Sequence, residues 1–172
     1  MIFLLLGTEE LPFDRAVDRA LPLTSDDDLV VQHGFTPPRD DAERISWIRF
    51  AAYDRILALC REASAVVCHA GVGTIMTAMS VGKTPLVIPR LARFGEAVDD
   101  HQLQISSELA RTNMVVHLED ADDIREAIRL TAVSQESRER SVSLHRAVAE
   151  AVDGTAEPAL RRLFHAWTAG RS

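Results

Sequence analysis

The residues whose types and spacing best suit binding or catalysis are His69-Ala70-Gly71-Val72-Gly73-Thr74. An apolar run, residues 65–69, leads into the two glycines, and a helix-compatible run follows without a spacer. This order predicts a buried strand, a glycine turn and a helix N-terminus. N–H groups there lack intrahelical acceptors and the helix dipole is positive, so the turn favours an anion. Gly71 and Gly73 would let the backbone approach a phosphate closely.

Other polar residues fall where they can join this turn. Gly7-Thr8 follows the first strand-like run, and ligands of open α/β sheets bind at the edge where parallel strands end. Thr74 would add a hydroxyl to the turn amides. His69 has two interpretations: it donates a hydrogen bond to a phosphate or sugar, or it is a strand-end histidine satisfied by the backbone.

The elements that must position these residues alternate along the chain. Strands are expected at residues 2–6, 28–33, 45–50, 65–69, 85–89 and 114–118, and helices at 13–21, 54–63, 74–81, 99–111 and 122–133. This alternation of strands and helices predicts an α/β, Rossmann-like fold with a doubly wound parallel sheet over residues 1–133. Residues 134–172 are expected to form a C-terminal helical extension that packs on the domain or on a partner through Leu160, Leu163, Phe164 and Trp167.

Composition narrows the class of protein. The chain has 172 residues, 47% of them hydrophobic, and a net charge of −7, which argues against nucleic-acid binding. The opening run is too short to span a bilayer and lacks a signal-peptide charge pattern. Two cysteines and scattered histidines offer no disulfide framework or metal spacing. We expect a cytoplasmic protein.

Two glycine motifs resemble those of other nucleotide-binding enzymes, but each lacks a glycine that the motif requires. Gly82-Lys83-Thr84 resembles the end of a P-loop, but Thr77 stands where that motif needs glycine. Gly71-Val72-Gly73 resembles a dinucleotide fingerprint, but Met76 occupies the third glycine position. A nicotinamide- or ATP-dependent enzyme is therefore disfavoured, and a cofactor found in the purified protein would revive it.

Together these segments resemble the C-terminal, donor-binding domain of glycosyltransferase family 28. The motifs that carry the resemblance are the His69–Thr74 turn, Gly82-Lys83, Pro89-Arg90 and Asp100-His101-Gln102. The opening Ile2–Thr8, followed by Pro12-Phe13-Asp14-Arg15, is similar to the small catalytic subunits of two-component transferases. Those subunits act in dolichol-linked UDP-GlcNAc transfer and in bacterial exopolysaccharide synthesis. The resemblance covers roughly residues 1–130.

The resemblance implies one half of a GT-B fold. This half would bind a UDP-sugar as donor substrate, with no cofactor and no metal, for an inverting transfer to a lipid-linked or glycosylated acceptor. A membrane-associated subunit would supply the acceptor side, including the base. The alternative is a non-catalytic nucleotide-sugar-binding or partner-binding module, for instance a homodimer.

The resemblance also implies roles for individual residues. Phosphate contacts are expected from the first strand-end loop, the glycine turn and Arg90, and sugar contacts from Gln102 first and Asp100 second. Thr77 stands where some relatives carry an acidic residue for the ribose diol, and threonine cannot form that bidentate clasp. Alternatively, Asp99 or Asp100 only caps a helix, and Arg90 and Arg93 are solvated. The expected catalytic residue is His69, and the expected donor-binding residues are Gly7, Thr8, Gly71, Gly73, Thr74, Thr77, Arg90, Asp100, His101 and Gln102.

Overall fold

A computed structural model describes residues 1–39 and 44–134. The chain divides between Ala132 and Val133 into two units, and the sheet, its core and the pockets belong to the first. Almost all of the predicted C-terminal extension, including Phe164 and Trp167, lies outside the described residues. Its packing therefore stays a prediction.

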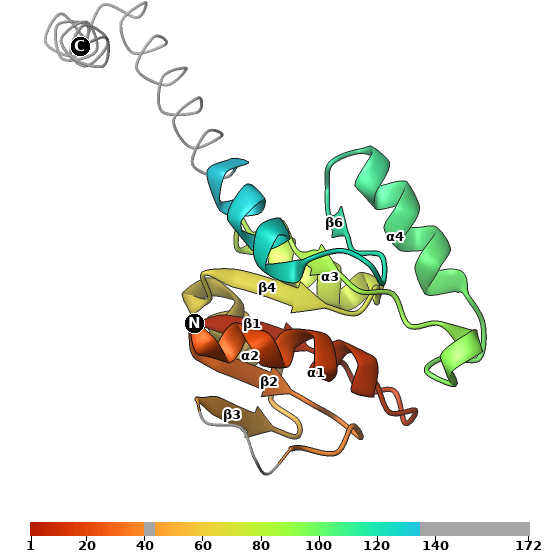
Figure 1. Ribbon diagram of the computed structural model, residues 1–172, viewed down its shortest axis with the longest axis horizontal. Coiled ribbons are helices and arrows are strands. Elements are labelled where there is room, and N and C mark those ends of the chain that lie inside the picture. Colours follow the sequence, from red (N-terminus) through yellow and green to blue (C-terminus); the bar gives the residue numbers. More distant parts are fainter. Residues whose placement is uncertain (40–43, 135–172) are drawn as a thin grey trace, which may run out of the picture. The chain divides into compact units, whose positions relative to one another are not determined.

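The first unit is built on a six-stranded parallel sheet with the order β3-β2-β1-β4-β5-β6 (Figure 1). The strands are β1 (Ile2–Leu5), β2 (Leu29–Gln32), β3 (Ile45–Ile48), β4 (Ala65–Cys68), β5 (Leu86–Val87) and β6 (Val116–His117). Strand order runs outward from β1 in one direction and from β4 in the other, so the sheet reverses its winding between these two strands. The predicted doubly wound, Rossmann-like fold is confirmed.

Helices cover both faces of the sheet. They are α1 (Asp14–Ala20), α2 (Tyr53–Glu62), α3 (Val72–Ser80), α4 (His101–Arg111) and a helix that begins at residue 124. Side chains of α1 and of the helix at residue 124 join the core on one face, and those of α2, α3 and α4 join the core on the other. Two short 3₁₀ turns, Leu21–Ser25 and Ala92–Phe94, were not predicted.

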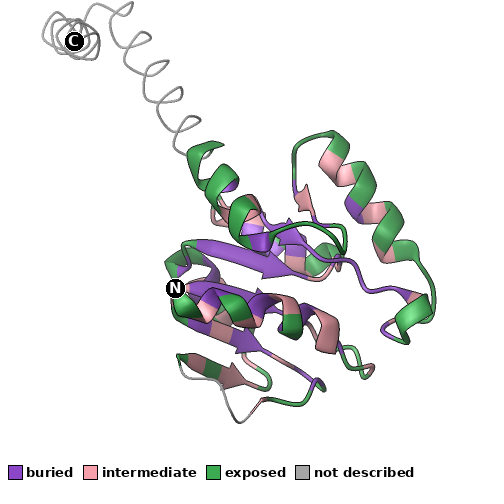
Figure 2. Cartoon of the chain, in the orientation of Figure 1, coloured by how far each residue is buried: buried purple, intermediate pink, exposed green. Residues whose placement is uncertain are grey.

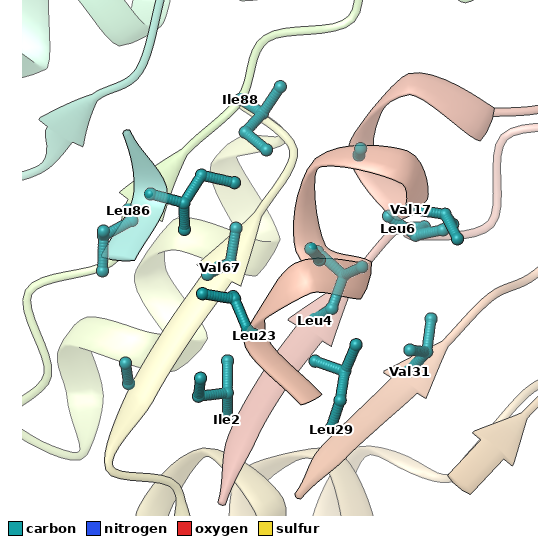
Figure 3. Close-up of a cluster of buried hydrophobic side chains, with 14 of the residues drawn as sticks. Ile2, Leu4, Leu6, Val17, Leu23, Leu29, Val31, Val67, Leu86 and Ile88 are labelled. Carbon is teal, nitrogen blue, oxygen red and sulfur yellow. The ribbon is translucent and has the colours of Figure 1, made fainter. Parts of the chain in front are cut away.

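The central strands are apolar on both sides because both of their faces are covered. In β1, Ile2 and Leu4 point into the core beneath α1, while Phe3 and Leu5 point into the opposite core. Figure 2 shows the central strands buried between more exposed helices, and Figure 3 shows the first core, with side chains from β1, β2, β4, β5 and α1. Burial on two faces therefore holds the strand ends, and the loops that follow them, in fixed positions.

Element boundaries differ from the prediction in two informative places. The strand predicted at 85–89 shrinks to β5, because it is bounded by Pro85 and by Pro89, which lack the N–H group that a ladder needs. Helix α3 begins two residues earlier than predicted, so Gly73 and Thr74 both lie in its first turn.

The rejected P-loop motif is a structural turn. Gly82 follows α3 with a φ of +79°, a left-handed conformation that suits glycine at the end of a helix. The Lys83 ammonium donates a hydrogen bond to the carbonyl of Ala63 at 2.6 Å. This lysine therefore ties two connections of the fold together.

A buried ion pair joins two motifs that are far apart in the sequence. The Arg15 guanidinium donates two hydrogen bonds to the Glu96 carboxylate, at 2.9 Å and 2.7 Å. The same carboxylate accepts the N–H of Leu91 at 3.1 Å. Only 5% of the Glu96 side chain is exposed, so these partners must offset the cost of burying its carboxylate.

We predict that Glu96→Ala lowers the free energy of unfolding by about 3 kcal/mol, because the partly buried guanidinium of Arg15 loses its carboxylate partner. Urea denaturation measures this change. The matched control is Glu108→Ala, which removes an exposed i,i+3 pair with Arg111 and should leave the midpoint unchanged. Equal effects of the two substitutions would contradict the structural role of Glu96.

Candidate functional site

A pocket of about 420 Å³ opens at the C-terminal edge of the sheet, next to the reversal between β1 and β4. Open α/β sheets bind ligands at this kind of switch point. The walls come from the loops after β1, β3 and β4, the start of α3 and the first turn of α4. The lining residues are Leu5, Gly7, Thr8, Glu9, Gln32, Phe50, Ala51, Ile56, His69, Gly71, Gly73, Thr74, Thr77 and Gln102.

Most of the residues predicted for the site meet in this pocket. Those brought together are Gly7, Thr8, His69, Gly71, Gly73, Thr74, Thr77 and Gln102. Three others, Arg90, Asp100 and His101, do not line it. The ligand-binding roles of all these residues stay predictions.

The start of α3 supplies unpaired donors to the pocket. The first intrahelical hydrogen bond runs from the N–H of Ile75 to the carbonyl of Gly71 at 3.0 Å. The N–H groups of Val72, Gly73 and Thr74 precede it and have no acceptor within the helix. No acidic residue lies in this first turn, so the positive end of the helix dipole is not compensated there. This end of the pocket therefore suits an anion.

The His69 ring occupies the space that two glycines leave open. A Cβ added at Gly7 would lie 2.6 Å from His69 Nε2, and one added at Gly71 would overlap the ring at Cε1. Gly7 also has a φ of +79°, which disfavours any other residue. The imidazole thus sits between the loop after β1 and the loop after β4 and fixes their separation.

Both nitrogens of His69 have partners. The N–H of Gly71 donates to Nδ1 at 3.1 Å, which requires a lone pair on that nitrogen. The proton of the neutral ring then lies on Nε2, which is 3.1 Å from Thr74 Oγ1. Burial, aided by the charge of Arg90, lowers the pKa of His69 to about 4, although a Gln102 hydrogen bond opposes the shift. His69 is therefore neutral near pH 7, and its Nε2–H group donates to Thr74 Oγ1, which leaves the Thr74 hydroxyl proton for a ligand.

Gln102 is oriented by two backbone groups. Its Oε1 atom accepts the N–H of Ala70 at 3.1 Å and that of Arg90 at 3.4 Å. Because the oxygen is engaged in this way, the group that Gln102 can present to a ligand is its NH2. The amide bridges the loop ends after β4 and β5.

The neighbouring residues of the Asp100-His101-Gln102 motif have other positions. Asp99 Oδ1 accepts the N–H of His101 at 3.0 Å, and Asp100 Oδ1 accepts the N–H of Ala92 at 2.9 Å. The His101 side chain is 75% exposed. Asp100 lines a second pocket of about 700 Å³ that also includes Arg93, Leu103 and His117. Asp99 and Asp100 thus act locally, on the start of α4 and on the loop before it.

Arg90 is buried, which contradicts the alternative of a solvated arginine, and its expected phosphate contact stays a prediction. Its side chain is 1% exposed and lies over the Phe13 ring, 4.6 Å from the centroid. Its guanidinium donates to the carbonyls of Leu6 at 2.9 Å, Leu11 at 2.7 Å and Glu96 at 3.0 Å. The residue follows a buried strand, so its side chain supports the loop after β1 from within the protein instead of reaching into the pocket.

Gln32 is a positioning residue that sequence reasoning missed. It accepts the N–H of Gly7 at 3.1 Å and donates to the carbonyls of Gly7 at 3.0 Å and Arg49 at 2.9 Å. This side chain holds the backbone of the Gly7 turn at both its donor and its acceptor. The available signal was a glutamine at the end of an otherwise apolar strand, where it is 4% exposed.

Thr77 uses its hydroxyl within its own helix. Its Oγ1 donates to the carbonyl of Gly73 at 2.7 Å, an i to i−4 bond, and the residue is 8% exposed. The proton of this hydroxyl is therefore not available to a ligand. Within the described ranges, no group of three or more His, Cys, Asp or Glu residues is arranged to hold a metal ion.

Comparison with known proteins agrees with this arrangement. The model of the Glycosyltransferase family 28 C-terminal domain matches residues 1–154. The chain belongs to this family. A 63-residue segment of this family 28 domain is 32% identical to a Yarrowia lipolytica protein named UDP-N-acetylglucosamine transferase subunit ALG13. That match spans 37% of this chain and only 30% of the relative.

Two solved glycosyltransferases share the fold. The glycotransferase of kitacinnamycin superposes with a TM-score of 0.58 at 17% identity, over 93% of this chain and 41% of that protein. SnogD from Streptomyces nogalater superposes with a TM-score of 0.51 at 19% identity, over 79% of this chain and 38% of that protein. The family 28 domain thus corresponds to less than half of either protein, as expected for one half of a GT-B fold.

Alanine substitutions at Gly71 and Gly73 should affect the stability of the domain differently. Gly71→Ala should destabilise the domain by about 2 kcal/mol, because the new methyl group overlaps the His69 ring. Gly73→Ala should leave the melting temperature unchanged or slightly higher, because nothing lies within 4 Å of a Cβ there and alanine favours a helix. Thermal unfolding followed by circular dichroism compares the two, and a larger loss for Gly73→Ala would contradict the packing described.

His69 should also make stability depend on pH. Its pKa is near 6.5 when unfolded and about 4 when folded, so the unfolded chain binds more protons between these values. The stabilising contribution of the neutral ring is complete above about pH 6.5 and falls as the pH drops toward 4. The difference in unfolding free energy between the wild type and His69→Asn should shrink over this window, and a difference that stays constant would contradict the assignment.

Proposed function

We propose that this domain is the donor-binding catalytic subunit of a metal-independent, inverting glycosyltransferase. It binds a UDP-sugar and transfers the sugar to a lipid-linked or glycosylated acceptor in polysaccharide or glycoconjugate synthesis. The observation that carries the proposal is the uncompensated N-terminus of α3 in a pocket at the switch point of a family 28 domain. The similarity to a Yarrowia lipolytica UDP-N-acetylglucosamine transferase subunit supports a UDP-sugar as the donor.

The donors in the pocket suit a diphosphate leaving group. The N–H groups of Val72, Gly73 and Thr74 would bind its oxygens, and the Thr74 hydroxyl, oriented by the Nε2–H of His69, would add a side-chain donor. In the transfer, the acceptor oxygen bonds to the anomeric carbon as the bond from that carbon to the diphosphate breaks. The bonding electron pair passes to the diphosphate, where preorganised N–H groups stabilise the growing charge.

The acceptor side is assigned to a second subunit. His69 carries its proton on Nε2 and has a low pKa, so it is a poor base for an acceptor hydroxyl. The base that takes that proton would come from a membrane-associated partner. Among the described residues, no helix is long and apolar enough to cross a membrane. The proposal places the domain in the cytoplasm and at the membrane only through that partner.

A second candidate function is a non-catalytic binding module, for instance a homodimer that retains nucleotide-sugar binding. The observation that favours it is the engagement of both His69 nitrogens and the burial of Arg90, which leave the pocket with few charged groups. Turnover with a purified partner, a UDP-sugar and an acceptor separates the two functions. No turnover despite tight UDP-sugar binding would favour the binding module.

We expect Gly73→Ala to weaken UDP binding at least 10-fold in isothermal titration calorimetry, because a methyl group would enter the space over the first-turn amides. The matched control is Met76→Ala, which shortens an exposed side chain on the same helix and should bind UDP like the wild type. Unchanged affinity in Gly73→Ala, with the domain folded, would show that the diphosphate site is wrongly assigned.

A further inference from the structure

Glu9 supplies the one carboxylate among the residues that line the 420 Å³ pocket. It lies two residues after Gly7, in the loop that Gln32 and Arg90 hold in place. Within the described ranges it forms no ion pair and no hydrogen bond, although its charge interacts favourably with the buried Arg90. An exposed carboxylate with open acceptor positions therefore faces a site otherwise rich in donors.

A negative charge in a diphosphate pocket needs an explanation. A carboxylate repels phosphate oxygens and can only accept hydrogen bonds. The neutral donors that a nucleoside diphosphate offers next to its phosphates are the ribose hydroxyl groups. Rossmann-type folds commonly satisfy ribose hydroxyls with an Asp or Glu side chain.

The order of the strands places Glu9 where the ribose of a nucleoside diphosphate would lie. The anion end of the pocket lies at α3, after β4, and the apolar wall of Phe50 and Ala51 lies after β3. Two strands, β1 and β2, separate these ends, so the span is roughly 14 Å at the usual strand spacing. A base against Phe50 and a diphosphate at α3 would put the ribose between them, over the loop after β1 that carries Glu9.

Thr77 cannot serve the ribose as a carboxylate would. Its hydroxyl proton is donated to the Gly73 carbonyl, and its side chain is nearly buried. We propose that Glu9 accepts hydrogen bonds from the 2′- and 3′-hydroxyl groups of the donor nucleotide. The inference rests on the proposed function and adds the residue that selects a ribonucleotide.

The test is calorimetric titration of the full chain with UDP and with 2′-deoxy-UDP. The wild type should prefer UDP about 10-fold, and Glu9→Gln should weaken UDP binding about 10-fold and bring the two affinities close together. Glu10→Gln, a neighbouring change of the same charge outside the pocket lining, should behave like the wild type.

The sign of the effect separates ribose binding from a simple charge role. If Glu9 only neutralises Arg90 or lies near the phosphates, Glu9→Gln removes repulsion and UDP binds equally well or more tightly. That result, or a UDP preference that survives in Glu9→Gln, overturns the inference while leaving the donor site intact. A wild type that binds neither nucleotide overturns the proposed function and this inference together.

Discussion

The site depends on the His69 imidazole held between two glycines. The ring fills the space beside Gly7 and Gly71, so the loops after β1 and β4 approach each other at the width of one aromatic ring. Its Nδ1 takes the N–H of Gly71, which orients the turn at the start of α3. The neutral state of the ring follows from burial and from the nearby charge of Arg90. One packing contact thereby sets the geometry of the pocket and the protonation state of its histidine.

Buried polar side chains extend this constraint beneath the pocket. Arg90 binds three backbone carbonyls, including that of Leu6 just before the Gly7 turn, and Gln32 binds the turn itself. Arg15 and Glu96 then join the start of α1 to the loop after β5. These groups keep their hydrogen bonds only if the loops stay where they are, so the edge that would meet a nucleotide is preorganised before any ligand arrives.

The fold could be predicted from the sequence because the patterns that indicate each strand and helix lie within short segments. Apolar runs predicted the strands and helical spacing predicted the helices. The glycine turn and Gln102 could be placed at one sheet edge because parallel strands end together. The burial of Arg90 could not be predicted because its motif gives no direction for the side chain. Only the three-dimensional positions of Leu6, Leu11 and Glu96 show that the guanidinium points inward. Gln32 and Glu9 were missed because their roles depend on loops brought together from distant segments.

The central claim is that the first turn of α3 binds the diphosphate of a nucleotide. Amide chemical shifts of the ¹⁵N-labelled full chain, followed during titration with UDP, test it most directly. Saturable shifts are expected at the N–H groups of Val72, Gly73 and Thr74, together with shifts of the Gly71 N–H and of the His69 ring. Shifts confined to the second pocket around Leu103 and His117, or none at saturating UDP, would contradict it.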